Sequence, residues 1–328
     1  MTTRWVMRQR AVYRLAVALV LASVTAVFAQ DYPAKPIRLL IDFPAGGASD
    51  SLARVVGQRL TEALGQPLVY DNRPGANGII AYGLTAKANP DGYTLGILST
   101  PFPLNAALGR KLSYDTLKDF TPISFIANYP NVLVVHPSVP ARSVQEFVGF
   151  AKSKAGAMSY ASGGSGSPQH LAMELFRGVA GFESVHVPYT GSATAITDVI
   201  GGRVQANITV LPTAVPHLKA GRLRVLGVLS QTRAVQLPEV PTFIESGYAV
   251  IASGWGGIGA PAGIPRHVVT KLHAEIARAV SAPEVRERIG AVGGEPRFGT
   301  PEEFAKFIRD EVTRWIPVVR ASGATAEN

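Results

Sequence analysis

Apolar residues along this chain alternate between short continuous runs and longer segments with helical spacing. The run Ile37–Phe43 is mostly apolar and predicts a buried parallel strand. In Asp50–Leu64, apolar residues recur at helical spacing, which predicts a helix that ends at Gly65. The alternation continues with a strand at Pro67–Tyr70, a helical segment that ends at Ala88 and a strand at Tyr93–Leu98.

Two later runs predict crossings between domains. The long apolar stretch Ile123–Val135 is interrupted at Tyr129–Asn131, as expected where a chain passes from one domain into another. The glycine-rich run Ala249–Ala260 predicts the return crossing. The elements expected after the first crossing are a helix at Ser143–Ser153, strands at Met158–Ala161, Ser184–Val187, Val204–Thr209 and Leu223–Leu229, and helices at Pro265–Ala279, Pro283–Ile289 and Pro301–Ala321.

This alternation of strands and helices predicts an α/β fold with parallel sheets that are covered on both faces. Two such sheets joined by two crossover strands predict a two-lobed clamp, with the ligand at the carboxyl ends of the strands. We expect domain 1 to comprise residues 30–129 plus 253–328, and domain 2 to comprise residues 130–252.

Residues 1–29 have the pattern of a secretory signal peptide. Four arginines precede the apolar segment Leu15–Phe28, and small residues at Val27 and Ala29 predict cleavage near Ala29, so that the mature chain begins at Gln30. The apolar segment is short for a membrane span, although an uncleaved N-terminal anchor is the alternative interpretation.

Composition and charge narrow the class of function. The chain has 328 residues and no cysteine, which excludes disulfides and thiolate metal sites. Its formal charge is +9, and removal of the four signal arginines leaves 28 basic and 23 acidic residues. The basic residues are scattered, so we expect no nucleic-acid partner.

Two glycine-rich turns carry the candidate chemistry. Each follows a predicted strand and opens a predicted helix: Pro44–Ala48 leads into Ser49 and Asp50, and Ser162–Gly166 leads into Ser167 and Pro168. Backbone N–H groups at the positive end of a helix dipole bind anions. Neither turn contains lysine or arginine. We therefore interpret the pair as a site that captures a small carboxylate with free backbone N–H groups.

Enzyme signatures are weak. The segment Gly163–Ser167 does not match the G-x-S-x-G elbow of hydrolases, and the sequence contains no phosphate-binding loop. Of the 6 histidines, only His267 and His273 share a predicted helix, and they do not share a face well. We expect no metal, no cofactor and no enzyme activity. The alternatives are an input module for a membrane sensor kinase, and a periplasmic hydrolase or isomerase.

Several motifs together resemble one family across nearly the whole mature chain, the tripartite tricarboxylate transporter substrate-binding proteins, or Bug family. The motifs are Tyr32–Arg38, Phe43–Asp50, Asn72–Gly78, Asn89–Leu95, His186–Gly191, Gly201–Val204 and Ala260–Pro265. The resemblance implies a monomeric periplasmic binding protein of type II, a Venus flytrap. It also implies delivery of a small carboxylate or related organic solute to a membrane permease with one large and one small subunit.

The resemblance also implies the ligand-binding residues. They are Phe43, Ala45, Gly46, Gly47, Ala48, Ser49 and Asp50 from the first turn, Ser99 and Thr100 from the third strand, Ser162, Gly163, Gly164, Ser165, Gly166, Ser167 and His170 from the second turn, and Tyr189 and Thr209. Ser49 or Asp50 is expected to cap its helix, and Ser167 with Pro168 is expected to open the other. For His170 and Tyr189, a structural role and a ligand contact both remain open.

Two positions depart from the family. Asp42 stands where the family often has proline, and its carboxylate either repels an anion or points away from the cleft. Thr209 stands where the family often has an acidic residue, which removes a partner for a ligand ammonium. This favours simple carboxylates or aromatic acids over amino acids, while the identity of the ligand stays open.

Overall fold

Two mixed β-sheets organise the computed structural model, which describes residues 32–291 and 293–322. Every element below belongs to the compact unit that begins at Lys35. The predicted signal peptide and its cleavage site lie outside the described residues. No helix in the described part of the chain is long and apolar enough to span a membrane.

The first sheet has the strand order β11-β4-β10-β3-β1-β2. Ile37, Leu39 and Ile41 in its β1 strand have no exposed surface, because helices cover both faces of the sheet. This confirms that the apolar run is a buried strand. The strands are β1 (Ile37–Ile41), β2 (Leu68–Asn72), β3 (Thr94–Ser99), β4 (Phe120–Tyr129), β10 (Gly254–Pro261) and β11 (Glu295–Pro296).

The second sheet has the order β7-β6-β8-β5-β9. Side chains of β5 alternate between two cores, with Leu133 on the face packed by α5 and α6 and Val132 on the face packed by α7 and α8. The strands are β5 (Asn131–Val135), β6 (Ser159–Ser162), β7 (Val185–Pro188), β8 (Ala206–Val210) and β9 (Arg224–Val228).

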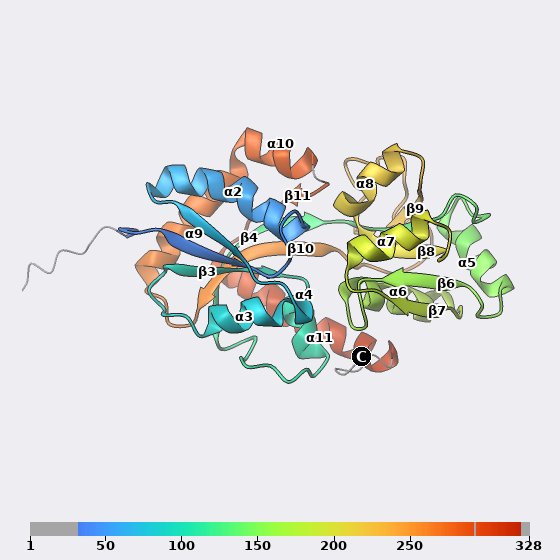
Figure 1. Cartoon of the computed structure of the whole chain (residues 1–328), viewed down its shortest axis with the longest axis horizontal. Coiled ribbons are helices and arrows are strands. Elements are labelled where there is room, and N and C mark those ends of the chain that lie inside the picture. The colour runs from blue at the N-terminus through green and yellow to red at the C-terminus, as the bar shows by residue number, and fades with distance from the viewer. Residues whose placement is uncertain (1–31, 292, 323–328) are drawn as a thin grey trace, which may run out of the picture. The chain divides into compact units, whose positions relative to one another are not determined.

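Helices cover both sheets (Figure 1). The predicted α2 ends as expected at Gly65, which adopts a left-handed conformation with φ 66°. Sequence reasoning missed α4, a short helix after β3. The helices are α2 (Ala48–Leu64), α3 (Ile79–Ala86), α4 (Pro101–Ala107), α5 (Val144–Ser153), α6 (Pro168–Ala180), α7 (Ser192–Ile200), α8 (Leu211–Lys219), α9 (Arg266–Ser281), α10 (Pro283–Ala291) and α11 (Pro301–Ser322), with a 3-10 turn η1 (Ala76–Gly78) before α3.

The chain passes between the sheets where the sequence predicts. It leaves β4 at Tyr129 and enters β5 at Asn131, and it returns through β10, which begins at Gly254 beside Tyr129. The expectation of parallel sheets is wrong, because β10 runs antiparallel to β3, and β5 runs antiparallel to β8. Each crossing strand enters its new sheet from the edge at which the parallel strands end, so it must run against them.

Helix α11 also connects the two halves. Near its start, Phe304 and Ile308 join the aromatic core of the first sheet. Near its end, Trp315 and Val319 join the core that covers β5 in the second sheet. In Figure 1, α11 begins below the first sheet and ends near α6, and the two helices are in contact. The division into domains at residues 130 and 252 remains a prediction, and α11 is a third connection that it did not include.

Candidate functional site

The topology places both glycine-rich turns at the edges where the chain crosses between sheets. β1 and β3 are parallel, so the first turn and Ser99 lie at one edge, which is also the edge where β10 begins. β6 and β8 are parallel, so the second turn lies at the edge where β8 ends and β5 begins. Most of the predicted site residues therefore gather at two carboxyl edges, as expected.

In the first turn, the two glycines do not offer free donors. The N–H of Gly46 donates to Asp50 Oδ2 at 2.9 Å, and the N–H of Gly47 donates to the carbonyl of Pro44 at 3.2 Å. In the first turn of α2, which follows directly, the N–H groups of Ala48, Ser49 and Asp50 have no partner among the described residues. The expected glycine donors are thus replaced by helix donors.

Asp50 fastens this turn. Besides Gly46, its carboxylate accepts from Arg54 Nε at 2.9 Å and Asn72 Nδ2 at 3.1 Å. Burial raises the pKa of Asp50, but the hydrogen bonds from Arg54, Gly46 and Asn72 together hold that pKa below its usual value. The expected capping role of Asp50 is wrong, because none of these donors is an N–H group of the first turn of α2. Ser49 does not cap, because Gly47 is the N-cap residue and makes no side-chain bond.

Beneath the turn, the side chain of Asp42 points into the part of the molecule that contains the first sheet. Its side chain is buried and accepts hydrogen bonds from Tyr82 at 2.6 Å and from Ser99 at 2.5 Å. This matches the interpretation in which Asp42 points away. The predicted site residues Ser99 and Thr100 both have internal partners, since Thr100 Oγ1 accepts from the N–H of Trp255 at 3.0 Å.

The second turn is tied in a similar way. Ser167 caps α6 as predicted, with its hydroxyl accepting from the N–H of His170 at 3.3 Å, and Pro168 follows. The N–H of Gly164 donates to the Ser162 hydroxyl at 3.1 Å, and the N–H of Gly166 donates to His170 Nδ1 at 3.0 Å. In this turn and the start of α6, the N–H groups of Gly163, Ser165 and Gln169 have no partner among the described residues.

A stacked histidine pair supports this turn. The rings of His170 and His186 are 3.9 Å apart, and His186 Nε2 lies 2.6 Å from the Ser162 hydroxyl. Burial lowers the pKa of each histidine to about 4, so both are neutral near pH 7. The geometry gives His170 structural contacts, and its contact with a ligand remains a prediction. Sequence reasoning missed His186, whose signal was only its place at the end of a strand beside the turn.

Tyr189 and Thr209 complete the predicted set. Tyr189 follows β7 and packs against the core that lies beneath α7 and α8. Its hydroxyl donates a hydrogen bond to the Asp198 carboxylate at 2.6 Å. Thr209 is fully buried on β8, and its hydroxyl has no partner among the described residues. In this conformation both side chains have packed environments, and their contact with a ligand remains a prediction.

Arg110 reaches the second turn from the other half of the molecule. It follows α4, and its Nη2 donates to the carbonyl of Ser165 at 3.3 Å. Burial lowers the pKa of the Arg110 guanidinium. The sequence alone did not predict this cation, because the contact joins residues that are distant along the chain.

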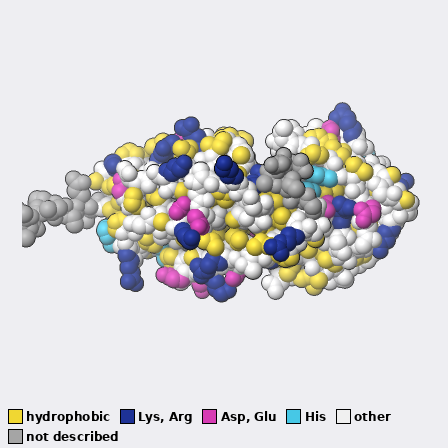
Figure 2. All heavy atoms as spheres, turned by 90° about the horizontal axis from the view of Figure 1, so that it is seen from below, with side chains coloured by type: hydrophobic (Ala, Val, Ile, Leu, Met, Phe, Trp, Pro, Cys, Tyr) yellow, Lys and Arg dark blue, Asp and Glu magenta, His cyan; other side chains and the backbone are white. Residues whose placement is uncertain are grey.

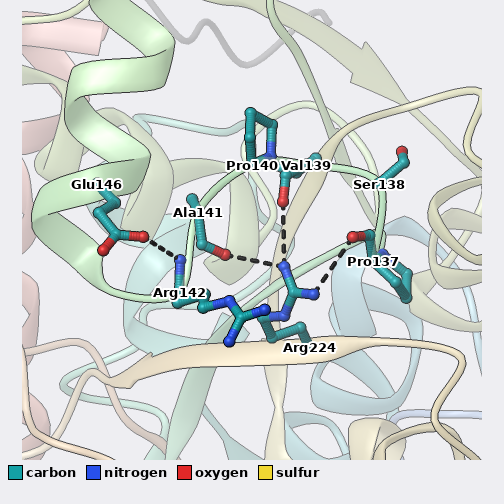
Figure 3. Close-up of a pocket in the computed structure, with 8 residues that line it drawn as sticks. All are labelled: Pro137, Ser138, Val139, Pro140, Ala141, Arg142, Glu146 and Arg224. Carbon is teal, nitrogen blue, oxygen red and sulfur yellow. Dashed lines mark hydrogen bonds between the residues drawn. The ribbon is translucent and has the colours of Figure 1, made fainter.

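A separate cavity lies next to Arg224 (Figure 3). The Arg224 guanidinium donates to the carbonyls of Val139 at 3.1 Å, Ala141 at 3.0 Å and Pro137 at 3.3 Å, so it fastens the connection from β5 to α5. Because β5 runs antiparallel to β8, this connection lies at the edge of the sheet opposite the second turn. The cavity is therefore not part of the candidate site.

Other site types receive no support from the described residues. They contain no cluster of three histidine or acidic side chains that could hold a metal ion. Lysine and arginine side chains are spread over the face seen in Figure 2 and do not form one patch.

Comparison with known proteins connects this arrangement to one family. The model of the family described as "Tripartite tricarboxylate transporter family receptor" matches residues 52–324. The protein BugT of Bordetella pertussis is 38% identical over 301 residues, which cover 91% of this chain and 92% of BugT.

Solved structures that resemble this chain include periplasmic binding proteins. An R. palustris protein with adipate has a TM-score of 0.84 and 35% identity, over 90% of this chain and 99% of the other. The periplasmic binding protein BugD has a TM-score of 0.80 and 28% identity, over 90% of this chain and 99% of its own.

Proposed function

Since this chain belongs to the receptor family of the tripartite tricarboxylate transporters, we propose that it captures a small carboxylate between its two glycine-rich turns and delivers it to a membrane permease. As a member of that family it is a solute-binding receptor and not an enzyme, and its relatives are periplasmic. The observation that carries the proposal is the pair of turns with unpartnered N–H donors at the two carboxyl edges.

Each turn supplies one half of the site. On the first side, the N–H groups of Ala48, Ser49 and Asp50 converge at the positive end of α2. On the second side, the N–H groups of Gly163 and Ser165 accompany the start of α6. Ligand carboxylates at both ends of a short aliphatic chain fit this arrangement, and the adipate held by the R. palustris relative has this chemistry.

Further parts of the proposal concern export, partners and motion. The mature chain begins near Gln30 after cleavage at Ala29, and it works as a monomer with a permease of one large and one small membrane subunit. Residues 30–129 plus 253–328 close on residues 130–252 around the ligand, because the ligand binds both sides only in the closed form. A role as input for a sensor kinase uses the same closed form.

The test is a binding screen of the purified mature protein. Small molecules released on denaturation are identified by mass spectrometry, and calorimetry measures the affinity for succinate, glutarate, adipate, pimelate and citrate. We expect at least one of these acids to bind, and its monoamide to bind more weakly, since one carboxylate is lost. Binding of none of them, together with release of a non-acidic molecule, contradicts the proposal.

A further inference from the structure

Helix α4 connects the two edges that carry the glycine-rich turns. It begins at Pro101, directly after Ser99 and Thr100 at the carboxyl edge of the first sheet. Farther along the same helix, Leu104 and Leu108 belong to the core of the second sheet. The end of α4 is therefore held against the second half of the molecule by apolar packing, although the helix follows a strand of the first sheet.

The end of this helix fixes the place from which the Arg110 side chain starts. Gly109 has a left-handed φ of 65°, which ends the helix. Its N–H donates to the carbonyl of Ala106 at 3.0 Å. The N–H of Arg110 donates to the carbonyl of Asn105 at 3.2 Å. These two bonds form a Schellman motif, so the backbone of Arg110 is fastened to the last turn of α4.

The Arg110 side chain holds one peptide group of the second turn. Its Nη2 donates to the carbonyl of Ser165 at 3.3 Å, and the N–H of the same peptide group, which belongs to Gly166, donates to His170 Nδ1 at 3.0 Å. The packing here is tight, because a β-carbon at Gly166 would lie 3.0 Å from Leu108 Cδ1 and 3.1 Å from Arg110 Nη2. This peptide group is therefore held from both halves of the molecule, next to the unpartnered N–H of Ser165.

Arg110 also brings a positive charge to a turn that has none of its own. The turn Ser162–Gly166 contains no lysine or arginine. Nε of Arg110 is buried without a hydrogen-bond partner among the described residues, so the cation is incompletely solvated. A carboxylate bound at the turn lowers this cost, since opposite charges attract more strongly where water is excluded. At the first turn, by contrast, Arg54 is already paired with Asp50 at 2.9 Å.

We propose that Arg110 is a positioning and charge-balancing residue of the second turn: it restrains the peptide group between Ser165 and Gly166 and attracts the ligand carboxylate that binds there. This inference rests on the proposed function for the place of that carboxylate. The residue comes from the first half of the molecule and acts on the second, so it contributes to binding only while both halves are in contact. Its charge makes the affinity for a carboxylate depend on salt.

The experiment measures adipate binding by calorimetry at about 20 and 500 mM NaCl for the mature protein, Arg110→Gln and Arg110→Lys. Glutamine removes the charge but keeps an N–H donor, and lysine keeps both. At the lower salt concentration we expect Arg110→Gln to bind about tenfold more weakly than the unmodified protein, and Arg110→Lys to stay within about threefold of it. At the higher concentration the loss in Arg110→Gln is expected to shrink to about threefold, because ions screen the attraction.

Arg142→Gln is the matched control. It removes the same charge from an exposed arginine at the opposite edge of the second sheet, beside the cavity in Figure 3, and is expected to bind adipate like the unmodified protein. Equal losses in Arg110→Gln and Arg142→Gln show a general effect of net charge and overturn the proposal. A loss in Arg110→Gln that does not change with salt also overturns it, since that result is expected if Arg110 only supports the fold.

One outcome needs no variant. If the unmodified protein binds adipate equally well at both salt concentrations, no cation balances the carboxylate, and the proposal is overturned even where Arg110→Gln does not fold. Another acid that binds in the screen in place of adipate takes its place in the same comparison. If the unmodified protein binds no acid at all, the proposed function fails instead.

Discussion

Removal of one backbone donor at Ala48 is a direct test of the first turn. Ala48 is the first residue of α2, and its N–H has no partner among the described residues. Substitution Ala48→Pro deletes this N–H without adding a charge. A proline is favoured at the first position of a helix, and the preceding residue must be extended. Gly47 already is, with φ −75° and ψ 173°.

The same geometry occurs naturally in the second turn, where Pro168 opens α6 after Ser167 at φ −69° and ψ 157°. We therefore expect Ala48→Pro to fold normally. Gly46 is a poorer position for such a test, because its φ of +83° strains any other residue and confuses a loss of binding with a distorted turn.

The size of the effect follows from the lost hydrogen bond. A hydrogen bond to a charged group contributes about 1.5–3 kcal/mol, so the affinity for a carboxylate is expected to fall about ten- to hundredfold. Calorimetry with the acid identified in the binding screen measures it, and Ala48→Ser, which keeps the N–H, is the control. A folded Ala48→Pro protein with unchanged affinity refutes the argument that helix donors hold the carboxylate.

Three further predictions concern stability and export. Because burial lowers the pKa of His170 and His186 to about 4, unfolding takes up protons as pH falls below about 6.5, and the melting temperature is expected to drop between pH 6.5 and 4. The variant His170→Asn, which keeps an acceptor for the Gly166 N–H, should show a smaller drop. A variant with the same pH profile as the unmodified protein would contradict the assignment of a low pKa to His170. Trp315→Ala removes a side chain that is 2% exposed in the core of the second sheet, and the free energy of unfolding measured by chemical denaturation should fall by about 3–5 kcal/mol. A fall below about 1 kcal/mol would mean that α11 does not hold the two sheets together. Mass analysis of the exported protein should give an N-terminus at or near Gln30, and an intact N-terminus retained in the membrane would support an anchor.

Local sequence patterns determined most of the elements and the approximate place of the site. The apolar run before Asp42, the left-handed glycine at Gly65 and the Ser167–Pro168 start of α6 depend on neighbours along the chain, so they were readable from the sequence. The interruption at Tyr129–Asn131 identified the crossing for the same reason. The family resemblance added the class of function, since several motifs occur in the right order.

The tertiary structure alone decided which groups in the site are free. Gly46 and Gly47 lose their donors to Asp50 and Pro44, and the N–H of Gly166 is taken by His170, so the available N–H groups differ from those expected. Arg110 reaches Ser165, and α11 joins two cores, only because the fold brings distant segments together. Hydrogen-bond partners and strand direction depend on contacts across space, and a pattern along one chain does not contain them.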